Sequence, residues 1–138
     1  MSAGQLRCEE RWIVDRGAAA TQVVLIAPLL MMLTLLSVQF ALQWHAAHVA
    51  QTAAAQGLAA ARSDGGSAAA GQTRAREVLG AVGERVLQRP QVTAARSATE
   101  ARVTIKGEVI SVAPWLHLPA TGRAAGPVDR FVDVNEGG

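Results

Sequence analysis

The sequence contains few of the residues from which catalytic or ligand-binding sites are built. Its 138 residues include no tyrosine, two phenylalanines and three tryptophans, so a bulky aromatic-lined pocket is not expected. Cys8 is the one cysteine, which excludes an internal disulfide, and no second Cys or nearby His completes a metal site with it. The formal net charge is only +2 and the basic residues form no dense cluster, so we expect no nucleic-acid partner.

No group of residues forms a known catalytic or cofactor motif. His45 and His48 lie one helical turn apart, but no third ligand stands beside them, so we expect no bound metal. A Ser-His-Asp set can be written from scattered residues, yet no Gly-x-Ser-x-Gly elbow positions the serine. We therefore predict that the protein is not an enzyme and holds no cofactor. The residues of that scattered set are Ser111, His117 and either Asp129 or Asp133.

The sequence does have one long, uncharged apolar run, from Val23 to Leu42. The hydrocarbon core of a bilayer is about 30 Å thick and takes about 20 apolar residues of helix to cross. A single span must be helical, because only a helix satisfies its own backbone hydrogen bonds in lipid. Pro28 lies inside the run, where a membrane helix tolerates it with a gentle kink. We predict a transmembrane helix over this run.

The charges on the two sides of this run predict its orientation. Arg7, Arg11 and Arg16 precede it, whereas the first Lys or Arg after it is Arg62. Lys and Arg near the ends of a span favour the cytoplasmic side. We therefore predict a single-pass protein of the cell membrane, with its N-terminus in the cytoplasm and its C-terminal part extracytoplasmic.

The residues just before the apolar run resemble a pilus-type processing site. An ordinary secretory signal has an apolar region of about 7–15 residues followed by a small-residue cleavage site. Here the run is longer, and Arg16-Gly17-Ala18 stands before it. The stretch DRGAAATQVVLIAPLL resembles the N-terminal segment of TadE-like proteins, the pseudopilins of the Tad/Flp pilus machinery. That resemblance implies a prepilin peptidase that cuts on the cytoplasmic side, with Gly17 as the last leader residue and Ala18 as the first mature residue.

One residue departs from the family pattern. The family usually has Glu at the fifth mature position, and this chain has Gln22 there. In pilin-type filaments the resemblance implies that this carboxylate pairs with the N-terminal ammonium of a neighbouring subunit, and a charge in lipid requires such a partner. Gln22 offers an amide hydrogen bond without a counter-charge. This argues against incorporation into a filament, but not against a membrane-anchored component of the Tad machinery.

An alanine-rich segment follows the apolar run and predicts that its helix continues. Residues 43–62 have high helix propensity throughout, with Gly57 as the one residue that opposes a helix. We therefore expect the span to extend outward as a stalk. Residues 63–71, SDGGSAAAG, predict the end of this helix and a short linker.

The next segment predicts a second, amphipathic helix from Gln72 to Arg89. Pro90 should stop it, because the residue before a proline is disfavoured in the α region. Gly80 and Gly83 weaken the helix, and they would allow close approach to the stalk. Apolar residues recur at helical spacing along one stripe, namely Ala75, Val78, Leu79, Val82, Val86 and Leu87.

Two strands are predicted beyond Pro90. Alternation of apolar and polar residues over 101–109 indicates a half-buried strand, although Lys106-Gly107 could instead form a hairpin turn. Residues 113–115 mark a turn, residues 116–119 cross over, and residues 126–134 can return as a second strand that includes Phe131 and Val134. The stretch APWLHLPATGRAAGPVDRF again resembles the C-terminal pattern of TadE-like proteins.

These predictions combine into an α+β fold of pilin-like arrangement. It has a long N-terminal transmembrane helix that extends into a stalk, a second amphipathic helix and a small antiparallel sheet. We expect a cytoplasmic leader (1–17), the transmembrane helix and stalk (18–62) and a small extracytoplasmic α+β domain (63–138).

The resemblance implies a pseudopilin or minor structural component of a Tad/Flp-type pilus assembly system. Its expected partners are the bilayer, pilin or assembly-machinery subunits and the prepilin peptidase. The alternative is an uncleaved, signal-anchored cell-envelope protein that binds or regulates a partner. A secreted protein released by signal peptidase near residues 46–55 is disfavoured by the over-long apolar run.

Overall fold

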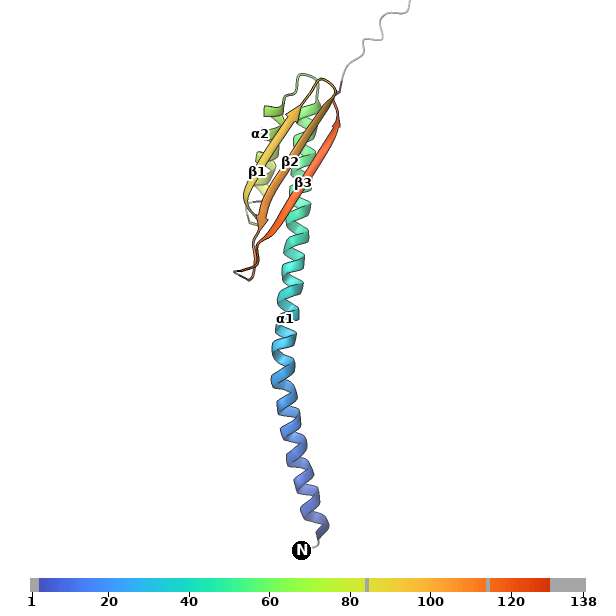
Figure 1. The fold of residues 1–138 in the computed structure, drawn as a ribbon, viewed down its shortest axis with the longest axis vertical. Helices are drawn as coiled ribbons and strands as arrows, with labels where there is room; N and C mark the ends of the chain where they lie inside the picture. Colours follow the sequence, from blue (N-terminus) through green and yellow to red (C-terminus); the bar gives the residue numbers. More distant parts are fainter. Residues whose placement is uncertain (1–2, 84, 114, 130–138) are drawn as a thin grey trace, which may run out of the picture. The chain divides into compact units, whose positions relative to one another are not determined.

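The computed structural model describes residues 3–83, 85–113 and 115–129, with the backbone alone described for residues 3–20. The elements are α1 (Ala3–Arg62), α2 (Ala68–Val78), the π-helical turn η1 (Leu79–Gly83), β1 (Leu87–Arg96), β2 (Glu100–Val109) and β3 (Leu118–Pro127) (Figure 1). The predicted α+β fold is confirmed. The chain divides into two compact units, residues 1–38 and 39–138, which we call the N-terminal unit and the C-terminal unit.

Helix α1 includes both the apolar run and the alanine-rich segment, with Pro28 inside it. It ends at Arg62, as predicted, and Gly65 in the following turn has a positive φ of 70° that a residue with a side chain rarely adopts. The Ser67 hydroxyl then accepts a hydrogen bond from the Ala70 N–H at 3.0 Å, which caps α2. Helix α2 therefore begins at Ala68, four residues before the predicted start.

The predicted C-terminal end of the second helix is wrong. The α-helix stops at Val78, the π-helical turn stops at Gly83, and Leu87 already belongs to β1. Gly80 and Gly83 within five residues lower the helix propensity, and the buried Leu87 is held in the sheet by pairing with Val109. The helix thus ends well before Pro90, which is not its stop signal.

Strand β2 is the centre of a three-stranded antiparallel sheet with the order β1-β2-β3. The predicted strand over 101–109 is confirmed, since β2 covers it. A hairpin turn at Lys106-Gly107 is wrong, because both residues lie inside β2. Lys106 pairs with Gln91 of β1 and with Thr121 of β3.

Strand β1 has no counterpart in the predictions from sequence. It pairs with β2 through a β-bulge, in which Arg89 and Pro90 lie between the paired residues Gln88 and Gln91. Arg89 takes a positive φ of 48°, and the bulge on an edge strand accommodates a proline that cannot donate to the ladder. The bulge faces Gly107, where a Cβ would lie 2.6 Å from Leu87 Cγ.

Strand β3 begins earlier than predicted. It runs from Leu118, in the segment that we expected to cross over, to Pro127, near the expected start of the last strand. Phe131 and Val134, which we expected in that strand, lie outside the described residues.

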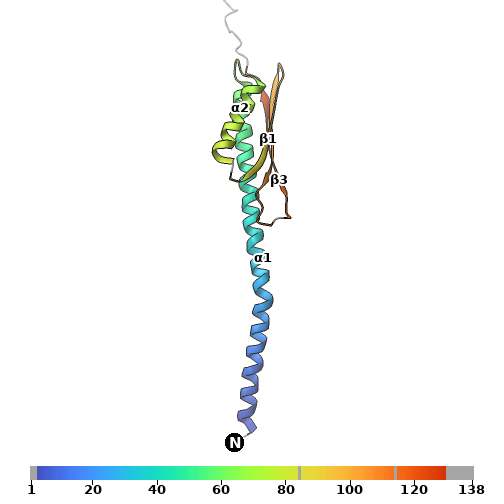
Figure 2. The same cartoon turned by 90° about the vertical axis from the view of Figure 1, so that its left-hand side faces the viewer.

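Helix α2 and the part of α1 in the C-terminal unit lie on the same face of the sheet, as Figures 1 and 2 show together. Alternate residues of β2 point to this face, and Val103 and Ile105 are completely buried there. Most of the core residues that come from the helices are alanines. Because their side chains are short, α1 can lie close to the strands. The α1 residues buried in this core are Ala46, Val49, Ala50, Ala53, Ala54 and Ala61.

Candidate functional site

Where its side chains are described, from residue 21 to residue 38, the N-terminal unit exposes apolar side chains around the helix. Its large hydrophobic side chains from Val23 to Val38 are between 40% and 70% exposed. The hydroxyls of Thr34 and Ser37 each donate at 2.9 Å to the carbonyl four residues earlier, so both donors are satisfied inside the helix. Among the described residues, one helix, Thr21–Arg62, is long and apolar enough to cross a membrane.

Gln39 lies within the apolar run but belongs to the C-terminal unit. It is only 6% exposed, and its Oε1 accepts a hydrogen bond from the Val112 N–H at 2.9 Å. The Ser111 hydroxyl lies 3.2 Å from the same oxygen and accepts from the Ala113 N–H at 3.1 Å. A polar side chain near the end of an apolar helix is commonly hydrogen-bonded to water or to a partner helix. The structure instead shows that it holds the segment between β2 and β3 against α1.

Two further glutamines of α1 hold β3 in the same way. Gln43 Nε2 donates to the Pro119 carbonyl at 3.0 Å. Gln51 makes a two-point contact with the backbone of Arg123, donating to its carbonyl at 2.9 Å and accepting from its N–H at 3.1 Å. These contacts could have been indicated in the sequence by the spacing of the three glutamines, Gln39, Gln43 and Gln51, which are four and eight residues apart on a helix rich in alanine. That spacing places them near one face, toward a strand with backbone groups to satisfy.

The predicted processing residues lie in α1. Gly17 and Ala18 have helical backbone, and their side chains are outside the described residues. Gln22 is exposed on the same helix, one residue before the apolar run. The role of these three residues in processing stays a prediction.

The residues considered for metal binding and catalysis are not brought together. His45 and His48 are on α1, and His117 is exposed before β3. The Ser111 hydroxyl is engaged with Gln39, whereas Asp129 Oδ2 lies 3.8 Å from Arg62 Nε. Asp133 lies outside the described residues. In the part of the chain that the structure describes, no group of three His, Cys, Asp or Glu residues could hold a metal ion.

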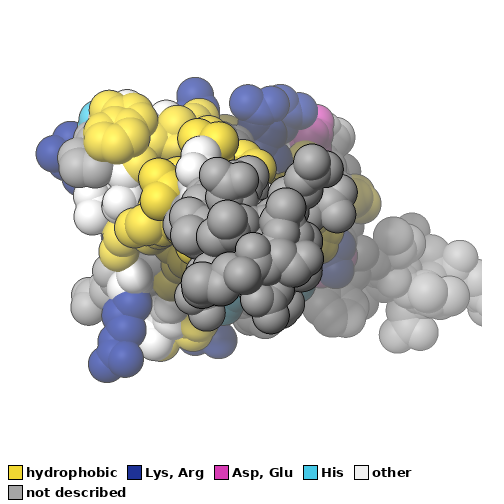
Figure 3. Space-filling view, turned by 90° about the horizontal axis from the view of Figure 1, so that it is seen from below, with side chains coloured by type: hydrophobic (Ala, Val, Ile, Leu, Met, Phe, Trp, Pro, Cys, Tyr) yellow, Lys and Arg dark blue, Asp and Glu magenta, His cyan; other side chains and the backbone are white. Residues whose placement is uncertain are grey.

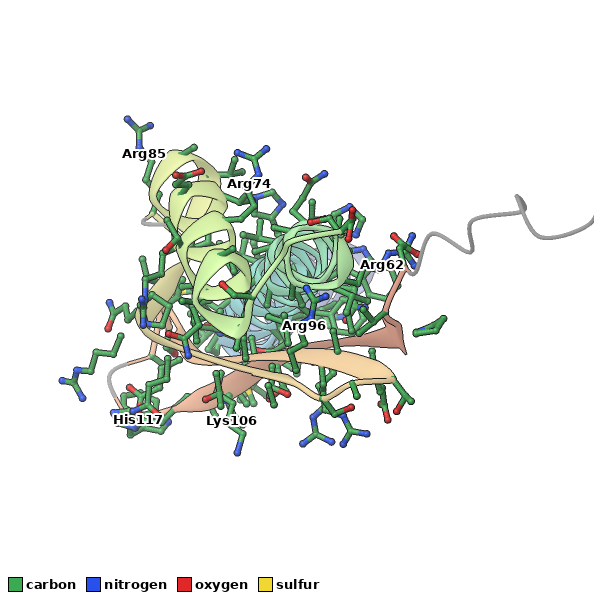
Figure 4. The ribbon with its side chains drawn as sticks, turned by 90° about the horizontal axis from the view of Figure 1, so that it is seen from above. Arg62, Arg74, Arg85, Arg96, Lys106 and His117 are labelled. Carbon is green, nitrogen blue, oxygen red and sulfur yellow. The ribbon has the colours of Figure 1, made fainter. Side chains whose placement is uncertain are left out.

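The C-terminal end of α1 is bound by residues from both edges of the sheet. Arg96 at the end of β1 donates from Nη1 to the carbonyls of Ala61, at 2.6 Å, and Ser63, at 3.1 Å. After β3, the Asp129 N–H donates to the Arg62 carbonyl at 3.0 Å. Figure 4 shows Arg62 and Arg96 near this end of the helix. A cation at a helix C-terminus also complements the helix dipole, so these contacts fix the end of α1 to the sheet.

We expect Arg96→Ala to lower the free energy of unfolding of the C-terminal unit by about 1.5 kcal/mol, because it leaves two helix-end carbonyls without a charged donor. The measurement is the urea midpoint of the full chain in detergent. Arg102→Ala is the matched control, since Arg102 is exposed on β2 and contacts Glu100 at 3.1 Å on the surface. Arg102→Ala should lower the free energy of unfolding by less than about 0.5 kcal/mol. Equal losses in the two variants would contradict a structural role for the Arg96 contacts.

The comparisons with known proteins relate one part of the chain to a family. The profile of the family described as TadE-like protein matches residues 17–58. This confirms the resemblance predicted from the N-terminal stretch, while the C-terminal resemblance lies outside the match and stays a prediction. Neither the curated proteins nor the solved structures include a match to the chain.

Proposed function

Residues 17–58 form a TadE-like domain, and from this premise we propose that the protein is a membrane-anchored pseudopilin or minor structural component of a Tad/Flp-type pilus assembly system. The observation that carries the proposal is the family match, which begins at Gly17 and includes the whole apolar run. The family implies a structural component of Tad pilus assembly, and not an enzyme.

The apolar helix would anchor the protein in the bilayer. Its large side chains are exposed over more than four consecutive turns. Soluble proteins rarely expose an apolar surface of this extent to water. No Lys, Arg, Asp or Glu occurs from residue 17 to residue 61, so a span can be placed here without a charge in lipid. The three arginines before the run favour a cytoplasmic N-terminus, and the C-terminal unit would then lie outside the cytoplasm.

A prepilin peptidase would remove residues 1–17 and expose Ala18 as the new N-terminus. The start of the family match at Gly17 supports this boundary, because the preceding residues lie outside the matched profile. After cleavage, the helix would hold the subunit in the bilayer, and the C-terminal unit would dock on pilin or on the assembly machinery.

Gln22 favours a second candidate function, an uncleaved, signal-anchored cell-envelope protein that binds a partner. Its neutral amide cannot form an ion pair with the N-terminal ammonium of a neighbouring subunit. If filament assembly depends on that pair, the chain would act beside the filament and not within it. The two candidates differ in the mature N-terminus that they require.

The test is co-expression of the full chain with a prepilin peptidase, followed by N-terminal sequencing and mass measurement of the membrane-bound protein. We expect the wild-type chain to lose residues 1–17 and to begin at Ala18. Gly17→Val should block this loss, because a branched side chain at the last leader residue obstructs a site that requires glycine. Gly4→Val is the matched control within the leader and should leave cleavage unchanged.

An intact Met1 in the wild-type protein under these conditions would remove the pseudopilin mechanism and leave the anchored alternative. Cleavage of both glycine variants at Ala18 would show that the processing site does not depend on Gly17.

A further inference from the structure

The segment between β2 and β3 exposes large apolar side chains. Trp115 is 82% exposed, Val112 is 44% exposed and Leu116 is 37% exposed. We call these three residues the loop patch. No Lys, Arg, Asp or Glu occurs from Val109 to Gly122, so covering the patch would desolvate no carboxylate, ammonium or guanidinium group of this segment. Large apolar side chains exposed together in one short segment are a feature of surfaces that contact another apolar surface.

The loop patch is held at a defined level along α1. Val112 donates its backbone N–H to the buried Gln39, and Gln43 fixes the other arm of the segment at the Pro119 carbonyl. Gln39 and Gln43 lie at the end of the apolar run of Val23 to Leu42. The two hydrogen bonds therefore hold both arms of the segment that carries the loop patch against α1 at Gln39 and Gln43, where the apolar run ends.

The same turns of α1 carry exposed aromatic side chains. Phe40 and Trp44 are each 71% exposed, and they lie one helical turn apart on one face. Figure 3 shows hydrophobic side chains exposed on the surface that is seen from below. Trp is enriched at membrane–water interfaces, where its ring lies at the level of the headgroups. Trp44 thus directly follows Gln43 on α1, and Trp115 belongs to the segment whose two arms are bound by Gln39 and Gln43.

We propose that the loop patch is a second membrane contact, inserted in the interface of the bilayer leaflet from which α1 emerges. This inference rests on the membrane anchor in the proposed function. The helix would fix the depth of the C-terminal unit, and the loop patch would fix its rotation about the helix axis. The unit would then lie against the membrane with one orientation, so that the same faces of the sheet and of α2 meet each docking partner.

The test uses three full-length variants with a single Trp each, reconstituted in phosphatidylcholine vesicles that contain brominated lipids as quenchers. In the first, Trp12→Phe and Trp44→Phe leave Trp115. In the second, all three native tryptophans are replaced by Phe and Leu33→Trp reports on the apolar helix. In the third, the same replacement is combined with Asp64→Trp, which reports on the exposed turn after α1.

We expect lipids brominated near the headgroup to remove about half of the Trp115 emission, because an interfacial Trp lies at that depth. Lipids brominated near the methyl ends should quench Leu33→Trp most strongly. Asp64→Trp should keep its emission with both lipids. Equal resistance of the three variants to trypsin would show that the substitutions leave the C-terminal unit folded.

The outcomes separate the inference from the function on which it rests. If Leu33→Trp is quenched and Trp115 behaves like Asp64→Trp, the anchor stands and the second membrane contact is overturned. If neither Leu33→Trp nor Trp115 is quenched, the anchor itself fails and the inference fails with it. If Trp115 becomes shielded only as the protein-to-lipid ratio rises, a second copy of the chain covers the loop patch and the membrane does not.

Discussion

Replacing Gly122 by alanine is expected to lower the free energy of unfolding of the C-terminal unit by about 3 kcal/mol or more, at the upper end of overpacking costs. Gly122 lies on β3 where that strand crosses α1. A Cβ there would overlap the Ala50 carbonyl group and lie 2.6 Å from the Gln51 backbone nitrogen. These are backbone atoms of a helix and cannot rotate away. The strand cannot retreat either, because Gln51 binds both backbone groups of the adjacent Arg123.

Gly126→Ala is the matched control on the same strand. Its Cβ would lie 3.6 Å from Leu58 Cδ2, which is ordinary contact, so we expect a change within about 0.5 kcal/mol. Trypsin provides the measurement, because residues 17–61 contain no Lys or Arg and cleavage beyond them reports on the C-terminal unit. Pulse proteolysis in urea gives the midpoint for the full chain in detergent. Equal midpoints for the two alanine variants would mean that β3 does not approach α1 as closely as the structure shows.

The elements that could be predicted from the sequence are those whose side chains carry a clear period. Helix α1 has a long uninterrupted apolar and alanine-rich sequence, and its end at Arg62 is marked by two glycines soon afterwards. Strand β2 alternates strictly because one face packs on the helices and the other faces water. Both elements follow from local chemistry, and both predictions are confirmed.

The two edge strands, β1 and β3, could not be recognised because their residues show no regular alternation of large apolar and polar side chains. Their residues are determined by how each strand packs. Strand β1 contains Pro90, and a proline is read as a break unless the bulge that accommodates it is known. Strand β3 faces α1 with small residues, Ala120, Gly122 and Ala124. The close approach of the helix requires small side chains there, so the strand lacks the large apolar residues by which strands are recognised.

The candidate site also has a part that could be predicted from the sequence and a part that could not. The TadE-like character of residues 17–58 could be predicted because the motif before the apolar run is local, and the family match confirms it. The role of Gln39 was not readable, since its partner Val112 lies 73 residues later in the chain. A polar residue near the end of an apolar run resembles a solvated helix end. Only the fold shows that a backbone N–H lies opposite it.

Gly57 carries the second large expected effect. It lies where α1 crosses α2, and a Cβ there would lie 2.8 Å from the Gly71 carbonyl oxygen and 2.9 Å from Ala75 Cβ. Overlap with a backbone oxygen and a buried side chain costs about 3 kcal/mol, while alanine in place of glycine in a helix returns about 1 kcal/mol. The cost of overpacking exceeds the gain in helix propensity, so Gly57→Ala should lower the free energy of unfolding by about 2 kcal/mol.

Gly80→Ala is the control, because the sequence and the structure lead to different expectations for this glycine. From the sequence, Gly80 and Gly83 are the glycines that allow close approach to α1. In the structure Gly83 does lie near Val49, with a Cβ distance of 3.3 Å to its Cγ1, but Gly80 has nothing within 4 Å. We therefore expect Gly80→Ala to be neutral or to stabilise the unit by up to about 1 kcal/mol, through helix propensity and a less flexible unfolded chain. The same urea midpoints measure both variants. A loss at Gly80 equal to that at Gly57 would contradict the open surroundings of Gly80, because it would mean that a Cβ there meets a neighbour as closely as one at Gly57 does.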